Sequence, residues 1–137
     1  VSRPRFPAEI QPMSVVGLGT DIVEISRVTK ALESSNRLAE RVLTDAELVI
    51  FHGHAQPDRY LAKRWAAKEA AAKALGTGIG RGISFQHIEI NNDELGAPHM
   101  TLIGAALEVA QQRGGRTALV SISDEQNYAM ATVVLSA

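Results

Sequence analysis

The stretch RYLAKRWAAKEAAAKALGTGIGRGISFQHIEI, residues 59–90, decides the fold. Pro57 and Asp58 stand just before it and are typical of a helix start, whereas Gly76 is typical of a helix end. We therefore expect one long helix from about residue 59 to 75. From Ile83 onward the apolar residues recur with a period of two, which indicates a strand. The stretch predicts a long helix, a glycine-rich loop and a strand in succession.

The predicted long helix carries charged residues beside its apolar stripe. With steps of about 100° per residue, Glu69 lies only ~40° from Trp65, and Lys73 lies a further ~40° away. Lys68 falls inside the apolar stripe, and Arg64 lies at its edge. Because an unpaired charge is costly to bury, these side chains must find a partner or a ligand. The core-facing stripe itself contains Leu61, Ala72 and Leu75.

Two interpretations of this helix and its loop stay open on the residues alone. Glu69 and Lys73 have the i,i+4 spacing of an ordinary surface ion pair. The loop at residues 76–82 holds four glycines, and such a loop beside a basic helix can let backbone N–H groups approach phosphate oxygens. It can equally be a plain connection, because it matches neither the dinucleotide motif nor the Walker motif.

Asp21 is a second candidate carboxylate. It follows a short apolar strand at residues 15–19 and precedes a helix whose apolar residues are Ile25, Val28 and Leu32. One interpretation makes Asp21 the N-cap of that helix. The other pairs it with Glu69, since two carboxylates with phosphate oxygens and waters are the usual ligands of Mg²⁺ at phosphoryl-transfer sites.

The remaining patterns complete a fold prediction. Thr44 and Glu47 form a capping box that predicts a further short helix, after another helical pattern at residues 38–43. Hairpins are expected around residues 91–96 and 124–127, with a helix at residues 105–113 between them. The order β-α-α-α-β-β-α-β-β predicts a single α+β domain with a mostly antiparallel sheet packed against the long helix.

Composition limits the class of protein. The 137 residues suit one domain, and 45% hydrophobic with 21% charged residues is typical of a globular chain. The net charge of −1 points to neither nucleic acid nor a membrane surface as a partner. The chain has no cysteine, which excludes a thiolate metal site and fits a cytoplasmic protein. No apolar run approaches the ~20 residues of a membrane span.

The first twelve residues differ from the rest. Three of the five prolines fall among residues 1–12, and no apolar segment typical of a signal peptide is present there. We interpret residues 1–12 as a flexible extension or an expression remnant. The single domain is then predicted at residues 13–137, beginning near Met13.

Three segments together resemble the holo-acyl-carrier-protein synthase family of 4′-phosphopantetheinyl transferases. They are GLGTDIVEISRV at residues 17–28, the stretch at residues 59–90, and VSISD at residues 120–124 followed by Tyr128 and Ala129. The resemblance covers about residues 15–135. It implies transfer of the phosphopantetheine arm of coenzyme A to a serine of apo-acyl carrier protein, with release of adenosine 3′,5′-bisphosphate, in support of fatty acid biosynthesis. It also implies Mg²⁺ as cofactor and a homotrimer with sites between subunits.

The resemblance further implies roles for individual residues. Asp21 and Glu69 match the metal carboxylates, and Lys73 matches the lysine that contacts the transferring phosphate. The chemistry of the transfer also requires a base, for which the candidates are Glu69 and a metal-bound water next to it. Arg27, on the first helix, matches a residue that docks the acidic helix of the carrier protein.

The coenzyme A contacts are implied in the same way. Arg64 and Lys68, together with Lys73, match basic positions near its phosphates, and the loop with Gly78 and Gly80 lies alongside. The role of Asp124 stays open, because some family members have histidine there. Two rival functions also remain: a carrier-protein-binding scaffold without catalysis, and a general coenzyme A or nucleotide-binding module.

Overall fold

The structure, a computed structural model, describes residues 14–137, so the predicted extension at residues 1–12 and its boundary at Met13 lie outside the described part. The helices are α1 (Ile25–Ser34), α2 (Arg37–Val42), α3 (Asp45–Gly53), α4 (Pro57–Leu75) and α5 (Gly104–Gln112), with a short 3-10 turn, η1 (Phe85–His87). The strands are β1 (Val15–Glu24), β2 (Ile88–Asn92), β3 (Pro98–Leu102), β4 (Thr117–Asp124) and β5 (Tyr128–Ser136). The predicted α+β class is confirmed. The predicted order of elements needs one correction, because four helices and not three precede the β2-β3 hairpin.

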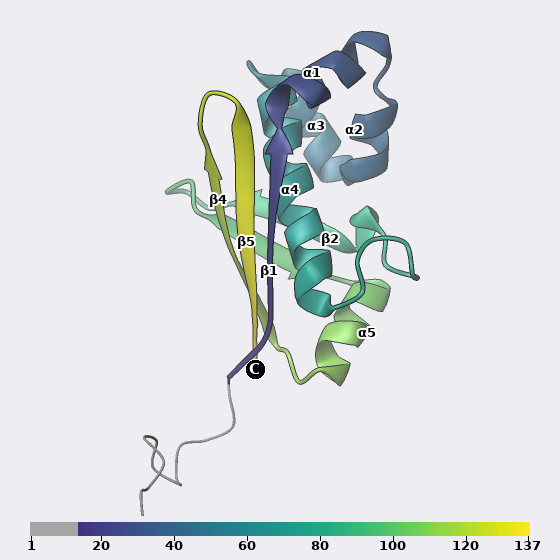
Figure 1. Cartoon of the computed structure of the whole chain (residues 1–137), viewed down its shortest axis with the longest axis vertical. Coiled ribbons are helices and arrows are strands. Elements are labelled where there is room, and N and C mark those ends of the chain that lie inside the picture. The colour runs from purple at the N-terminus through teal and green to yellow at the C-terminus, as the bar shows by residue number, and fades with distance from the viewer. Residues whose placement is uncertain (1–13) are drawn as a thin grey trace, which may run out of the picture.

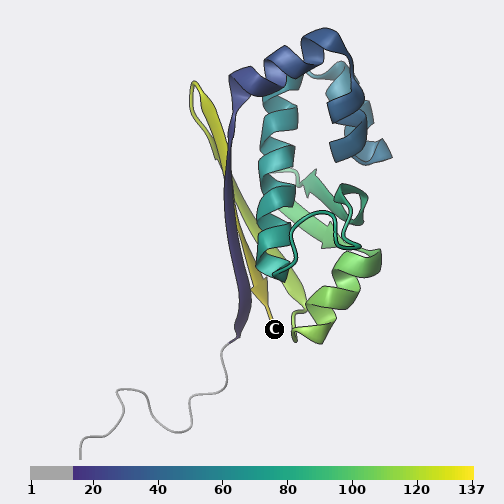
Figure 2. The same cartoon turned by 45° about the vertical axis from the view of Figure 1, so that its right-hand side comes forward.

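The strands form two antiparallel sheets around α4. One sheet has the order β1-β5-β4, and the other is the β2-β3 hairpin. Figures 1 and 2 show α4 between them, with the three-stranded sheet along one side and the hairpin and α5 on the other. We expected one sheet. The hairpin remains separate because, among residues 14–137, neither of its strands forms a ladder with a strand of the larger sheet.

The core is built on α4. The predicted stripe is confirmed, since Leu61, Ala72 and Leu75 are all buried. Alanines cover much of the remaining helix surface and are also buried: Ala62, Ala66, Ala67, Ala70, Ala71 and Ala74. Small side chains let the neighbouring backbones approach α4 closely. Gly76 ends the helix in the left-handed conformation, with φ 81°, as expected.

β1 lies directly on α4 because of two glycines. A Cβ atom at Gly19 would overlap the carbonyl oxygen of Ala70, and one at Gly17 would overlap that of Ala74. No side chain larger than hydrogen fits at either position without moving the strand. The two glycines therefore set the distance between the strand that carries Asp21 and the helix that carries Glu69.

The capping predictions have opposite outcomes. The capping box of Thr44 and Glu47 is confirmed in both directions. The interpretation of Asp21 as an N-cap is wrong, because β1 continues to Glu24 and Asp21 pairs with Ala131 in the sheet. Asp21 thus projects from a strand, which frees its carboxylate from a capping role.

The outer face of the three-stranded sheet is apolar. Large side chains on it are between about half and two-thirds exposed: Leu18 65%, Ile22 58%, Leu119 56% and Met130 47%. An exposed patch of this kind on a sheet is typical of a protein–protein interface. Within the part of the chain that the structure covers, no helix has both the length and the apolarity required to span a bilayer.

Candidate active site

A cleft of about 260 Å³ opens where the end of β1, the start of α1 and the middle of α4 meet. Asp21, Arg27, Trp65 and Glu69 are among the residues that line it. Asp21 comes from β1, Arg27 from α1, and the other two from α4. The structure thus brings together the two predicted metal carboxylates and the predicted docking arginine.

Lys73 contacts Asp21 and not Glu69. Its Nζ lies 3.0 Å from Asp21 Oδ1 and donates to the carbonyl oxygen of Thr20 at 2.9 Å. Among residues 14–137, Glu69 forms no ion pair within 4.0 Å, so the surface pair with Lys73 that its spacing allowed does not form. Lys73 is half exposed and can therefore reach a ligand in the cleft.

The carboxyl group of Glu69 is held in unfavourable surroundings for a negative charge. Burial, followed by the nearby charge of Asp21, raises the pKa of Glu69 above its ordinary value of 4.5. The Trp65 side chain and Lys73 act in the opposite direction. A cation placed beside Glu69 would stabilise the charged form of its carboxyl group.

The donor set fits Mg²⁺ bound together with a phosphate ligand. Asp21 and Glu69 face one cleft, and their like charges repel. Among the described residues, no three His, Asp or Glu side chains gather as a metal site. A closed cage of protein ligands is therefore not formed here. Mg²⁺ commonly takes one or two carboxylates and fills its other positions with waters and substrate phosphates.

Lys68 does not lie where we expected it. The structure buries it completely, and its Nζ donates to Glu47 Oε1 at 2.6 Å and to the carbonyl oxygens of Val42 at 2.7 Å and Phe85 at 3.2 Å. All three ammonium donors are therefore used inside the core. The prediction that Lys68 contacts coenzyme A is wrong. Burial lowers the pKa of Lys68, and Glu47 opposes that effect.

The glycine loop also differs from its predicted role. Gly78 and Gly80 have φ angles of 70° and 120°, which favour glycine. Their N–H groups donate to the carbonyl oxygens of Ala72 and Ile83, at 3.2 and 3.0 Å. These two N–H groups are not free to bind a phosphate. The two glycines therefore determine the conformation of the loop but provide no free hydrogen-bond donors.

Arg64 lies beside a second polar pocket, of about 310 Å³, lined also by Arg59, Tyr60, Lys63 and Asn92. Its guanidinium lies 4.8 Å from the centre of the Tyr60 ring and donates to Asn92 Oδ1 at 3.4 Å. Arg64 is buried, yet its Nε has no hydrogen-bond partner among residues 14–137, and neither has the Tyr60 hydroxyl. Sequence reasoning missed Tyr60 and Asn92, since neither belongs to a charge pattern.

Asp124 has a structural partner. Arg59 donates from Nη1 to Asp124 Oδ2 at 2.8 Å and to the carbonyl oxygen of Glu125 at 2.7 Å. Its Nη2 donates to the carbonyl oxygen of Gln126. Arg59 therefore holds the start of α4 against the β4–β5 turn.

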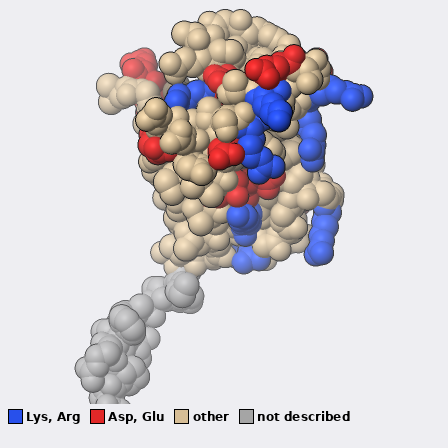
Figure 3. Space-filling model, turned by 45° about the horizontal axis from the view of Figure 1, so that its top comes forward, with Lys and Arg blue, Asp and Glu red and all other residues tan. Residues whose placement is uncertain are grey.

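In Figure 3, basic and acidic side chains lie next to one another on one face of the molecule.

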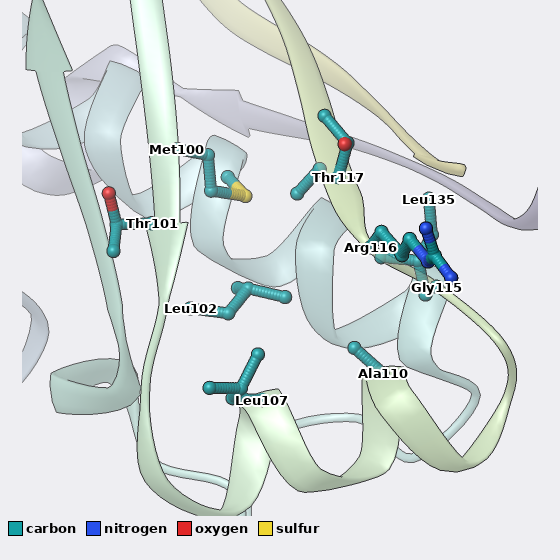
Figure 4. A pocket seen from close by; sticks show the side chains of 10 residues that line it. Met100, Thr101, Leu102, Leu107, Ala110, Gly115, Arg116, Thr117 and Leu135 are labelled. Carbon is teal, nitrogen blue, oxygen red and sulfur yellow. The ribbon is translucent and has the colours of Figure 1, made fainter. Parts of the chain in front are cut away.

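A third pocket, of about 250 Å³, lies between β3, α5 and β4 (Figure 4). Met100, Leu102 and Leu107 point into it from one side, and Thr117 and Leu135 lie opposite. Arg116 is the one charged residue in its lining. Its lining contains no Asp, Glu or His, which distinguishes it from the carboxylate cleft.

Comparison with known proteins agrees with this geometry. Residues 17–133 match the model of the 4'-phosphopantetheinyl transferase superfamily. The chain belongs to that superfamily. Within it, the chain is 61% identical over 124 residues to the holo-[acyl-carrier-protein] synthase of Shewanella amazonensis, which covers 90% of this chain and 99% of that protein. Its enzyme class is therefore holo-[acyl-carrier-protein] synthase, as the signatures predicted.

Solved structures extend the similarity to the fold. The holo-[acyl-carrier-protein] synthase of Neisseria meningitidis superposes with a TM-score of 0.81 at 41% identity, over 90% of this chain and 99% of the other. The enzyme of Helicobacter pylori, solved in complex with coenzyme A, gives 0.75 at 33% identity, over 87% and 99% of the two chains.

Proposed function

We propose that this chain transfers the 4′-phosphopantetheine group from coenzyme A to a serine of apo-acyl carrier protein, with Asp21 and Glu69 holding Mg²⁺. The observation that supports the metal role is the convergence of these two carboxylates on one cleft, with Lys73 3.0 Å from Asp21. When bound, Mg²⁺ would neutralise the diphosphate and stabilise the charge that develops on the leaving phosphate.

The side chains divide the chemical work. The serine hydroxyl forms a bond to the phosphorus nearest the pantetheine, and the bond from that phosphorus to the leaving 3′,5′-bisphosphate breaks in line. We assign the serine proton to Glu69, because its carboxyl group lines the same cleft as Asp21. Lys73 would neutralise the phosphate, since its half-exposed ammonium lies 3.0 Å from the Asp21 carboxylate.

Arg64 and its pocket supply a place for a coenzyme A phosphate. The unused Nε of Arg64 and the Tyr60 hydroxyl are buried donors that a phosphate could satisfy. Arg59 and Lys63 are the other cations of the same lining. Lys68 and the amides of Gly78 and Gly80 are not included, since their donors are engaged within the protein.

Two surfaces would serve the protein partners. Arg27 is exposed and lines the cleft beside Asp21 and Glu69, a position suited to an acidic helix of the carrier protein. The apolar outer face of the β1-β5-β4 sheet would form the contact of a homotrimer. We assign the enzyme to the cytoplasm and its product to fatty acid biosynthesis, on the ground of the family alone.

One assay tests the proposal. The chain is incubated with apo-carrier protein, coenzyme A and Mg²⁺, and the carrier protein is weighed by mass spectrometry. We expect a gain of one phosphopantetheine group that is lost when a chelator replaces the metal. A carrier protein of unchanged mass would favour the rival functions, a scaffold or a simple coenzyme A-binding module.

A further inference from the structure

Trp65 carries a hydrogen-bond donor that the fold leaves unused. It is the only tryptophan in the chain, and it lines the cleft together with Asp21 and Glu69. Its Nε1 is buried, and no described residue meets it with hydrogen-bond geometry. Buried donors usually have a partner, so an indole N–H left without one beside a catalytic cleft requires an explanation.

Helix geometry identifies the acceptor within reach. Glu69 follows Trp65 by four residues on α4, so both side chains lie on the same face. Side chains on a helix lean toward its N-terminus, which carries the Glu69 carboxylate back over the turn of Trp65. The two groups are close enough for the Trp65 side chain to lower the pKa of Glu69, although they are not yet aligned as a hydrogen bond.

We propose that Trp65 is a positioning residue for Glu69, whose carboxylate accepts the indole N–H through one oxygen and keeps the other for the metal. This inference rests on the proposed function, because it assigns Glu69 to Mg²⁺. Metal-binding carboxylates are commonly held by such an outer hydrogen bond, and loss of one typically weakens metal binding about 10–100-fold. A residue that only filled the core would need no N–H, since phenylalanine provides an apolar ring without a donor to satisfy.

The single tryptophan makes the contact directly measurable. In a ¹⁵N-labelled protein the indole N–H of Trp65 gives one signal, which needs no assignment by mutation. We expect that signal to move in Glu69→Ala and to stay in place in Glu108→Ala, which removes an exposed glutamate of α5. An indole signal at the same position in wild type and Glu69→Ala would overturn the proposal, even if the variants of the next experiment failed to fold.

Metal binding gives the second measurement. Mn²⁺ serves as the probe for the Mg²⁺ site, and its free concentration is followed by electron paramagnetic resonance, without any turnover. We expect Trp65→Phe to weaken Mn²⁺ binding about 10–100-fold. Thr77→Val is the matched control, because it also removes a buried polar atom that has no partner, but in the loop after α4 and outside the cleft. Its Mn²⁺ affinity should equal that of wild type.

The outcomes separate the two proposals. Mn²⁺ binding that is lost in Glu69→Gln and weakened in Trp65→Phe supports both. Binding that is lost in Glu69→Gln but stays within twofold of wild type in Trp65→Phe overturns the role of Trp65 and leaves the metal site standing. Binding that does not depend on Glu69 overturns the metal site, and the role of Trp65 falls with it.

Discussion

Lys68 and Glu47 form an ion pair inside the core, with Nζ 2.6 Å from Oε1 and neither side chain exposed. Glu47 also accepts the N–H groups of Thr44 and Ile90, at 2.9 and 2.8 Å. The pair therefore joins α4 to the start of α3 and to β2. Its role is structural, although Lys68 directly precedes Glu69, the proposed metal ligand, in sequence.

We expect Lys68→Met to lower the free energy of unfolding by about 3–5 kcal/mol, because it leaves the buried charge of Glu47 without a partner. Urea denaturation followed by circular dichroism measures the change. Lys30→Met, which alters an exposed lysine of α1, should stay within about 0.5 kcal/mol of wild type. Full stability of Lys68→Met with weakened coenzyme A binding would instead return Lys68 to the ligand site.

Lys73→Met should lower kcat about 100-fold or more, because a donor aimed at the developing phosphate charge is lost. The protein should remain folded, since Lys73 is half exposed. Steady-state kinetics with both substrates varied provide the test. An effect confined to the KM of coenzyme A would assign Lys73 to ground-state binding alone.

Glu69→Gln should abolish Mg²⁺-dependent turnover and, without metal, raise Tm at pH 7. The pKa of Glu69 is higher in the folded than in the unfolded protein, so its stabilising effect is present below 4.5 and is lost as pH rises through the folded value. The gain should therefore disappear in melts below pH 4.5. An equal gain at both pH values would assign it to something other than the charge.

Arg27→Ala should raise the KM for carrier protein several-fold and leave the KM for coenzyme A nearly unchanged. The exposed guanidinium is expected to attract a charged partner. The difference in KM for carrier protein between wild type and Arg27→Ala should therefore shrink as salt is added. Kinetics at low and high ionic strength measure this. Equal effects on both substrates would remove Arg27 from the docking surface.

Gly19→Ala should destabilise the fold and disrupt the metal site, because its Cβ would overlap the carbonyl oxygen of Ala70. Inserting one methyl group into a close contact costs about 1–3 kcal/mol. Gly53→Ala is the matched control, since a Cβ atom there meets nothing within 4 Å. Unfolding curves and Mn²⁺ titrations of both variants test the contrast, and similar behaviour of the two would contradict it.

The local patterns of the sequence predicted most of the fold. Helix caps such as Gly76 and the box of Thr44 and Glu47 act within a few residues, so they can be identified without knowledge of the rest of the chain. The separation of the β2-β3 hairpin from the larger sheet depends on contacts distant in sequence, and no local pattern reports it.

The candidate site shows the same limit. Helical spacing placed Glu69 beside Trp65 and Lys68 within the apolar stripe, and both lie there. The partner of Lys68 could not be read from the pattern, because Glu47 precedes it by 21 residues on another helix. The family resemblance therefore supplied a ligand role that the core contradicts. The amides of Gly78 and Gly80 were misjudged for a similar reason, since their acceptors are set by the conformation of the whole loop.

Because Gly17 and Gly19 contact α4 through main-chain atoms, the backbone itself fixes the distance between β1 and α4 at the active site. Main-chain atoms have the same radii in every protein, so the gap between β1 and α4 does not depend on which apolar side chains fill the surrounding space. The core could be extensively redesigned, by chance or by intent, while the two carboxylates kept their spacing. Substitution at these two positions cannot change the distance between β1 and α4 in small steps, because no residue is intermediate in size between glycine and alanine.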